Sequence, residues 1–299
     1  MSISDGPANA RLHERVAAKV SELTSTERRV AEYMAQNPDV VATGSASDLA
    51  RATGTSDATV VRTARSLGYA GLPELRREVI DTVIGRRDPA RVLGHRLGRL
   101  AENGNDLDRV IADSVAMLQE LRVRIDPEQW AAAVEALSGA SEVFSYGIGP
   151  AGCVAEYLTI MLNRIGVSSR SSTVTGFRLA DDLLGITPGD TVVVFAPLRR
   201  FREVDVVLRH ANSVDAKTIV ATEALGLALA DQSDTVLATP QTSTNTASET
   251  FASFLLAHAL VLSVAARRDG SVATMQLLNE LRSEVAGPNL DVGTSSSIT

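Results

Sequence analysis

A glycine-rich turn at residues 147–152 is the first feature of this chain that could do chemistry. It reads Gly147-Ile-Gly-Pro-Ala-Gly152 and lies between a strand-like run and an apolar helical stretch. Glycines at this spacing let a ligand phosphate approach the backbone N–H groups at the start of the helix. Pro150, and the lack of an acidic residue at the end of the next run, 167–172, argue against a dinucleotide. We expect an anion site whose lining includes Gly147, Gly149 and Ala151.

Two further segments offer polar groups to an anion. Arg199 and Arg200 follow the strand-like run 191–196 and could form charge-assisted hydrogen bonds with a ligand. The segment before the longest apolar helix supplies hydroxyl groups at Thr242, Ser243 and Thr244. Both segments also have plain structural explanations, namely exposed arginines that open a helix and ordinary cap or loop hydroxyls.

The sequence offers no metal site and no evident pair of catalytic acid and base. The four histidines lie far apart, and none has HExxH or CxxC spacing. Cys153 is the sole cysteine, and a small buried residue is a simpler account of it than a redox-sensitive thiol. We therefore expect no metal, no cofactor and no enzymatic activity.

The N-terminal third reads as short helices. Thr24-Ser-Thr-Glu27 and Ser45-Ala-Ser-Asp48 are capping-box patterns that open two of them, and a third helix runs from Ser56 to Leu67. The turn at Thr53-Gly-Thr55 joins the second helix to the third. This spacing is typical of a helix-turn-helix.

The third of these helices has one apolar face and one polar face. An arginine on such a helix can bridge guanine O6 and N7 in the major groove, and threonine can meet a thymine methyl group or a phosphate. The alternative is a small helical bundle whose polar face is merely solvated. The candidate DNA-binding residues are Ser47, Thr55, Ser56, Thr59, Arg62, Arg65 and Ser66.

From residue 143 onward, β-branched runs alternate with helical stretches. The runs 142–147, 191–196, 217–222 and 234–239 are typical of buried strands, and the stretches between them are typical of helices. This alternation predicts an α/β domain with a parallel sheet flanked by helices, behind an all-α N-terminal domain. The apolar stretch 251–266 is too short to span a bilayer and suits the core or an interface.

Charge also divides the chain. Residues 1–88 hold 12 basic and 12 acidic side chains, so the whole net charge of −7 falls on residues 89–299. We expect a helix-turn-helix domain at 1–86, a linker and connecting helix at 87–125, an α/β domain at 126–286 and a disordered tail at 287–299. The single cysteine and the charged N-terminus predict a cytoplasmic protein.

Longer strings carry a family resemblance. The string from Ser56-Asp-Ala-Thr-Val-Val-Arg62 to Gly71-Leu-Pro-Glu-Leu-Arg76 resembles the N-terminal domain of the RpiR family of bacterial transcriptional regulators, over residues 10–85. The strand-GxGxxG-helix pattern and Thr187-Pro-Gly-Asp190 resemble the SIS domain with which that family senses phosphosugars. The chain departs from the family at Ala196-Pro-Leu-Arg-Arg200, where hydroxyl residues are usual, and at Ala151, where serine is common.

The resemblance implies a regulator that binds double-stranded operator DNA and senses a small anionic metabolite, either a sugar phosphate or an altered ligand. The alternatives are a sugar-phosphate isomerase-like enzyme and a DNA-binding protein whose SIS-like domain only oligomerises. A helix-turn-helix with little excess charge binds DNA weakly as a monomer, because affinity grows with the number of phosphates neutralised. We therefore expect a homodimer or homotetramer, with no membrane partner.

Overall fold

The computed structural model describes residues 8–43, 45–87, 89–101, 105–196, 201–222, 229, 232–240 and 245–287. Their contacts divide the chain into two compact units. The first comprises Met1–Arg122, Glu223–Asp231 and Ala238–Glu249, and the second comprises Val123–Thr222, Gln232–Leu237 and Thr250–Thr299. The expected tail at 288–299 lies outside the described residues.

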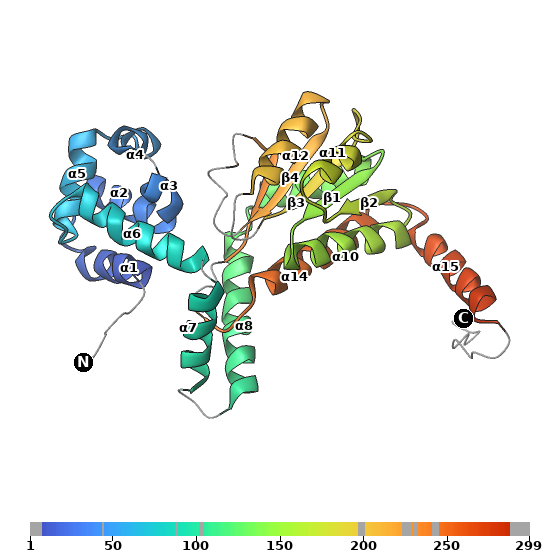
Figure 1. Ribbon diagram of the computed structural model, residues 1–299, viewed down its shortest axis with the longest axis horizontal. Coiled ribbons are helices and arrows are strands. Elements are labelled where there is room, and N and C mark those ends of the chain that lie inside the picture. Colours follow the sequence, from blue (N-terminus) through green and yellow to red (C-terminus); the bar gives the residue numbers. More distant parts are fainter. Residues whose placement is uncertain are drawn as a thin grey trace. The chain divides into compact units, whose positions relative to one another are not determined.

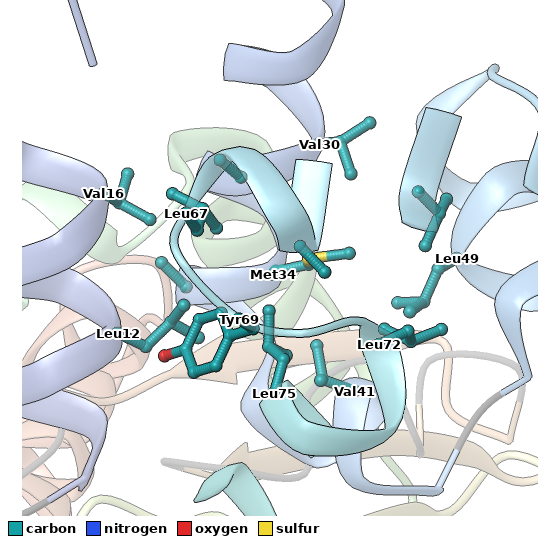
Figure 2. Packing of buried hydrophobic residues seen from close by; sticks show 14 of the residues in the cluster. Leu12, Val16, Val30, Met34, Val41, Leu49, Leu67, Tyr69, Leu72 and Leu75 are labelled. Carbon is teal, nitrogen blue, oxygen red and sulfur yellow. The ribbon is translucent and has the colours of Figure 1, made fainter. Parts of the chain in front are cut away.

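The first unit begins with a helical bundle, drawn in blue to cyan in Figure 1. Its apolar side chains gather around Met34, as Figure 2 shows, and Met34, Leu49 and Leu75 are fully buried. Helices as short as these are marginal in isolation, so this shared core supplies most of their stability. The helices are α1 (Ala8–Lys19), α2 (Ser25–Gln36), α3 (Pro38–Thr43), α4 (Ala46–Thr53), α5 (Asp57–Ser66) and α6 (Leu72–Arg87).

Local signals set the ends of these helices. Thr24 and Ser45 form the two predicted capping boxes. Gly54 ends α4 in the left-handed conformation, at φ +61° and ψ +40°, which glycine adopts without steric cost. The sequence predicts that the helix that Thr24 caps ends at Asn37-Pro38. In the structure the next helix, α3, begins at Pro38 itself, because proline fits the first helical position.

Two further helices follow in the first unit. Helix α7 (Pro89–Ala101) occupies a segment expected to be a linker, and α8 (Asp106–Arg124) contains the helix expected at 107–121. The sequence suggests a linker because composition shifts at 85–89 and a polar stretch follows at 102–106. Gly94 and Gly98 also lower the helix propensity of α7. Contacts with α8 support the helix, among them an ion pair of 3.4 Å between Arg99 and Asp113.

The second unit is the α/β domain that the sequence predicts. Its five strands form a sheet in the order β2-β1-β3-β4-β5, and the paired strands β1–β2, β1–β3 and β3–β4 are parallel. The central strands β1 and β3 are buried along their whole length. The elements are α9 (Pro127–Gly139), β1 (Val143–Gly147), α10 (Pro150–Arg164), β2 (Ser169–Ser172), α11 (Phe177–Leu183), β3 (Thr191–Phe195), α12 (Arg202–Ser213), β4 (Lys217–Thr222), β5 (Thr235–Ala238), α14 (Glu249–Ala265) and α15 (Ser271–Ala286).

Helices cover both faces of this sheet (Figure 1). Adjacent residues of β2 define the two faces, because side chains alternate along a strand. Ser169 Oγ donates to the carbonyl of Thr159 on α10, whereas Arg170 Nη1 donates to the carbonyl of Asp182 on α11. Among the described helices, none is long and apolar enough to cross a membrane.

Candidate functional site

Helices α4 and α5 and the turn between them form the predicted helix-turn-helix. Thr55 N–H donates to the carbonyl of Ala50 at 2.8 Å, which closes the turn behind Gly54. Ser56 then caps α5, because its Oγ accepts a hydrogen bond from the N–H of Thr59. The turn therefore separates α4 from α5, and the N–H of Thr59 in the first turn of α5 has a hydrogen-bond partner.

The exposed ridge of α5 consists of Ala58, Arg62 and Arg65. The sequence also placed Thr59 on this polar face, and that placement is wrong: Thr59 is 9% exposed. Its hydroxyl lies 3.0 Å from Ser56 Oγ and accepts from Arg62 Nη2 at 3.1 Å. Thr59 therefore holds the Arg62 side chain by a hydrogen bond. Arg62 and Arg65 are the long side chains that α5 exposes to solvent.

The remaining candidates surround this ridge at different depths. Ser47 is exposed in the first turn of α4, and Ser56 is exposed at the start of α5. Thr55 is half-buried, and its hydroxyl lies 2.9 Å from Thr53 Oγ1. Both helix N-termini carry partial positive charge, so the exposed hydroxyls stand where a phosphate group would be favoured.

Ser66 is held by a residue that the sequence assigned only to a helix cap. Its Oγ donates to Glu27 Oε1 at 3.0 Å, while the Glu27 carboxylate also accepts from Thr24. The hydrogen bonds from Thr24 hold the pKa of Glu27 below its ordinary value, and the bond from Ser66 and the charge of Arg62 act in the same direction. Glu27 therefore stays ionised beside α5 and links α2 to α5 through Ser66.

Two cations on α1 bind the C-terminal end of α5, and no local sequence pattern predicts these contacts. Lys19 Nζ donates to the carbonyl of Ser66 at 3.0 Å, and Arg15 Nη1 donates to that of Leu67 at 3.3 Å. The Arg15 guanidinium also lies over the Tyr69 ring, 4.6 Å from its centroid. Positive charge at a helix C-terminus is favourable, so α1 fixes the position of α5.

The glycine-rich turn joins β1 to α10 as predicted. Gly147 has no room for a Cβ, because that atom would overlap the backbone of Ala151 and Gly152. Gly149 is the N-cap of α10, at φ +61° and ψ −130°, and offers no side-chain acceptor to the first turn. The N–H groups of this turn are therefore not satisfied by a capping side chain, which is the arrangement expected at an anion site.

The turn lies where the strand order reverses. The chain passes from β1 to β2 on one side and to β3 on the other, and in open parallel sheets ligands bind at the carboxyl edge of such a point. Gly147 pairs with Phe195, so the chain leaves β3 beside the turn. The candidates on the following segments, Arg199, Arg200, Thr242, Ser243 and Thr244, lie outside the described residues.

Tyr146 is a polar residue at this edge that the sequence analysis missed. Its side chain lies on the sheet face opposite α10, and its hydroxyl donates to the carbonyl of Val174 at 3.0 Å. Burial raises the pKa of the Tyr146 phenol, and the negative charge of Glu203 raises it further. The phenol therefore stays protonated and ties the end of β1 to the chain leaving β2.

Ala151 and Cys153 show what the first turn of α10 presents. Residue 151 is a buried alanine, and alanine has no hydroxyl that could contact a ligand. Cys153 is exposed, which corrects the expectation of a buried thiol: Val154 and Ala155 take the sheet-facing side of the helix, and residue 153 points away. Among the described residues, no group of three or more His, Cys, Asp or Glu side chains could hold a metal ion.

Asp113 of α8 binds the segment just after the hydroxyl-rich candidates. It accepts hydrogen bonds from the N–H and Oγ1 of Thr246, and Arg96 of α7 donates to the carbonyls of Asn245 and Ala247. Helices α7 and α8 therefore bind the backbone at 245–247 through hydrogen bonds. No local sequence signal predicts these contacts, which join residues more than 130 positions apart.

Comparison with known proteins identifies the two parts of the chain. The helix-turn-helix domain of the rpiR family matches residues 10–83, which include α4, α5 and most of the bundle around them. The SIS domain matches residues 136–266, which include the whole parallel sheet. The chain belongs to the RpiR family. It carries the helix-turn-helix and the SIS domain in the order that the sequence predicts.

Individual proteins are similar to this chain over two thirds or more of its length. The NanR protein of Vibrio vulnificus, solved in complex with ManNAc-6P, has a TM-score of 0.59 at 24% identity and covers 93% of this chain and 100% of its own. A "Bifunctional protein glk" from Burkholderia orbicola is 27% identical over 74% of this chain. An uncharacterized HTH-type transcriptional regulator from Caldanaerobacter subterraneus is 25% identical over 68% of this chain and 71% of its own. The chain spans about a third of the length of the first curated relatives, such as the Burkholderia protein, of which it covers 34%.

Proposed function

We propose that this RpiR-family chain regulates transcription by binding double-stranded operator DNA through α5 and by sensing a small phosphorylated sugar, or a related anion, in its SIS domain. It does so in the cytoplasm and without catalysis. In this proposal residues 1–86 bind DNA, 87–125 connect the parts and 126–286 form the sensor. The observation that carries it is the pair of arginines, Arg62 and Arg65, exposed on the second helix of a helix-turn-helix.

The DNA half rests on the chemistry of that ridge. An arginine side chain is long enough to reach base edges from a helix in the major groove, and its planar fork matches guanine O6 and N7. The exposed serines at the starts of α4 and α5 suit phosphate contacts, which orient a protein without reading sequence. We assign base reading to Arg62 and Arg65, and phosphate contacts to Ser47 and Ser56.

The sensor half rests on the turn between β1 and α10. Its uncapped first turn favours a negative group, and the reversal of strand order places it where parallel sheets bind ligands. The NanR complex with ManNAc-6P supports a sugar phosphate as the ligand class. Because Ala151 supplies no hydroxyl, we expect backbone N–H groups to make the contacts at this turn.

The DNA half is tested by incubating the full chain with fragmented DNA of its own genome and sequencing what it retains. We expect a few fragments that share a symmetric sequence. Arg62→Ala should weaken binding to them by about 1–3 kcal/mol and relax base preference at one position of each half-site. Arg209→Ala on α12 removes the same charge from an exposed site outside the bundle and should change neither.

The sensor half is tested by calorimetry with pairs of ligands, each a sugar phosphate and its unphosphorylated sugar. We expect binding of at least one phosphorylated member and none of its partner. The ligand that binds should change the affinity for the retained DNA, since coupling requires different affinities in two states. Failure to retain specific fragments would overturn the DNA half, and failure to bind any phosphorylated sugar or related anion would overturn the sensor half.

A further inference from the structure

Glu27 is an acidic side chain beside the helix to which we assign DNA reading. It lies in the first turn of α2, and Ser66 Oγ on α5 donates to its Oε1 at 3.0 Å. Arg62 and Ser66 are four residues apart on α5, so both side chains lie on the same side of that helix. The carboxylate of Glu27 therefore lies on the side of α5 that carries Arg62.

This carboxylate is fixed both in position and in charge. Its Oε2 accepts from the N–H and the Oγ1 of Thr24, at 3.1 and 2.7 Å, while its Oε1 accepts from Ser66. The hydrogen bonds from Thr24 hold the pKa of Glu27 below its ordinary value, and the charge of Arg62 acts in the same direction. The carboxylate is thus bound to both α2 and α5 and stays ionised at neutral pH.

A second contact holds Arg62. Its Nη2 donates to Thr59 Oγ1 at 3.1 Å, and that hydroxyl lies 3.0 Å from Ser56 Oγ. A guanidinium has five N–H donors, and the edge of a guanine takes two of them. Arg62 can therefore keep its bond to Thr59 and the attraction of Glu27 while it reads a base.

A DNA phosphate competes for the same guanidinium. Non-specific binding is electrostatic and grows with the number of phosphates that the protein neutralises. An Arg62 side chain that turns to a phosphate gives up the attraction of Glu27, and the carboxylate repels that phosphate. Specificity is a difference between two affinities, so a charge that weakens the wrong mode of binding raises it.

We propose that Glu27 is a positioning residue that sets the sequence selectivity of α5, because it holds Arg62 for base reading and disfavours contact of Arg62 with phosphates. The inference rests on the proposed function, in which Arg62 reads a base. It assigns part of the selectivity to a carboxylate that acts through another side chain. A residue that served only as part of the α2 cap would change specific and non-specific binding alike.

Glu27→Gln removes the charge and keeps the local structure. Glutamine serves at this position of a capping box as glutamate does. Its amide oxygen can accept from Thr24, and its NH₂ can donate to Ser66 Oγ, because a hydroxyl also accepts. Fluorescence anisotropy with the full chain, over a range of salt concentrations, gives the dissociation constants for one retained genomic fragment and for an unrelated duplex of equal length.

We expect Glu27→Gln to raise the non-specific affinity about two- to fivefold and to lower the ratio of specific to non-specific affinity by about fivefold or more. The salt dependence of non-specific binding should steepen by up to about one phosphate contact. Glu32→Gln, at an exposed position on the same helix, removes the same charge and should leave the ratio unchanged. In an Arg62→Ala background Glu27→Gln should also leave it unchanged, because the effect acts through Arg62.

Circular dichroism shows whether Glu27→Gln keeps its helices. If it does not, Glu27→Asp decides, because aspartate keeps the charge, completes a capping box as Asp48 does in this chain, and withdraws the carboxylate from α5 by one CH₂ group. We expect Glu27→Asp to lower the ratio as well.

The outcomes separate this inference from the function on which it rests. A wild-type chain that retains no specific fragments would overturn the DNA half of the proposed function and this inference together. Specific retention by the wild type overturns the inference alone if the deciding Glu27 variant leaves the ratio unchanged. An equal fall of the ratio in Glu32→Gln, or in the Arg62→Ala background, overturns it alone as well.

Discussion

Asp113 on α8 accepts two hydrogen bonds from Thr246, one from the backbone N–H at 2.9 Å and one from Oγ1 at 2.8 Å. Arg99 and Arg109 each lie 3.4 Å from the same carboxylate. Thr246 comes two residues after the last of the hydroxyl-rich candidates, Thr244, and three residues before α14. One carboxylate therefore ties the α7–α8 pair to the backbone that leaves a proposed ligand segment.

Asp113→Asn should destabilise the first unit by about 1.5–3 kcal/mol, the range for hydrogen bonds to a charged group. The amide oxygen can still accept from Thr246, but the amide NH₂ would face Arg99 or Arg109, which are donors only. Urea denaturation at pH 7, followed by circular dichroism, measures the change. Asp108→Asn, near the exposed start of α8, is a control of equal charge, and an equal loss there would refute a specific role for Asp113.

The effect of Asp113→Asn should also depend on pH. Burial opposes ionisation of Asp113, but the hydrogen bonds from Thr246 and the charge of Arg109 outweigh it and hold its pKa below the ordinary value. A lowered folded-state pKa adds stability that is present above the unfolded-state pKa, about 3.9, and is lost as the pH falls through the folded-state value. The stability difference between wild type and Asp113→Asn should therefore be largest at neutral pH and shrink below about pH 4. A difference that grows on acidification would contradict this assignment.

Local patterns predicted most of the fold because they have local causes. The run Thr191–Phe195 is buried at every position, as a central parallel strand requires. Its β-branched residues are typical of such a strand, so the sequence alone predicts it. The capping boxes at Thr24 and Ser45 depend on residues three positions apart. Gly147 and Gly149 were identified for the same reason, since the tight turn between a strand and a helix demands glycine.

The parts that the sequence did not predict depend on distant contacts. Lys19 meets the end of α5 across 47 residues, and Asp113 meets Thr246 across 133. Thr59 was misplaced because a helical wheel shows which side a residue is on but not how far Ser56 and Arg62 cover it. The sequence did not predict helix α7, because the flanking segments 85–89 and 102–106 indicated a linker, whereas the contacts that support the helix reach residues 245–247.

Lys19→Met tests whether α1 positions the recognition helix. The substitution keeps the alkyl chain and removes the donor to the Ser66 carbonyl, so we expect the bundle to lose about 0.5–1.5 kcal/mol of stability. Affinity for specific DNA should fall with it, because α5 then loses part of its fixed position. Arg28→Met on α2 removes an equal charge from an exposed side chain and is the control. Equal losses of stability in the two variants would show that charge, and not the contact with α5, is responsible.

The same change of glycine to alanine should have opposite signs at two positions. At Gly149 a Cβ has nothing within 4 Å, so the cost comes from the backbone alone: φ +61° with ψ −130° is a conformation that other residues avoid. We expect Gly149→Ala to destabilise the α/β unit by about 1–3 kcal/mol.

At Gly94, inside α7, a Cβ again has nothing within 4 Å and the backbone is helical, so Gly94→Ala should stabilise the first unit by about 0.5–1 kcal/mol. Denaturant unfolding of both variants measures the two changes in the free energy of unfolding. Stabilisation by Gly149→Ala would mean that the turn between β1 and α10 adopts another conformation, and the proposed anion site would lose its geometry.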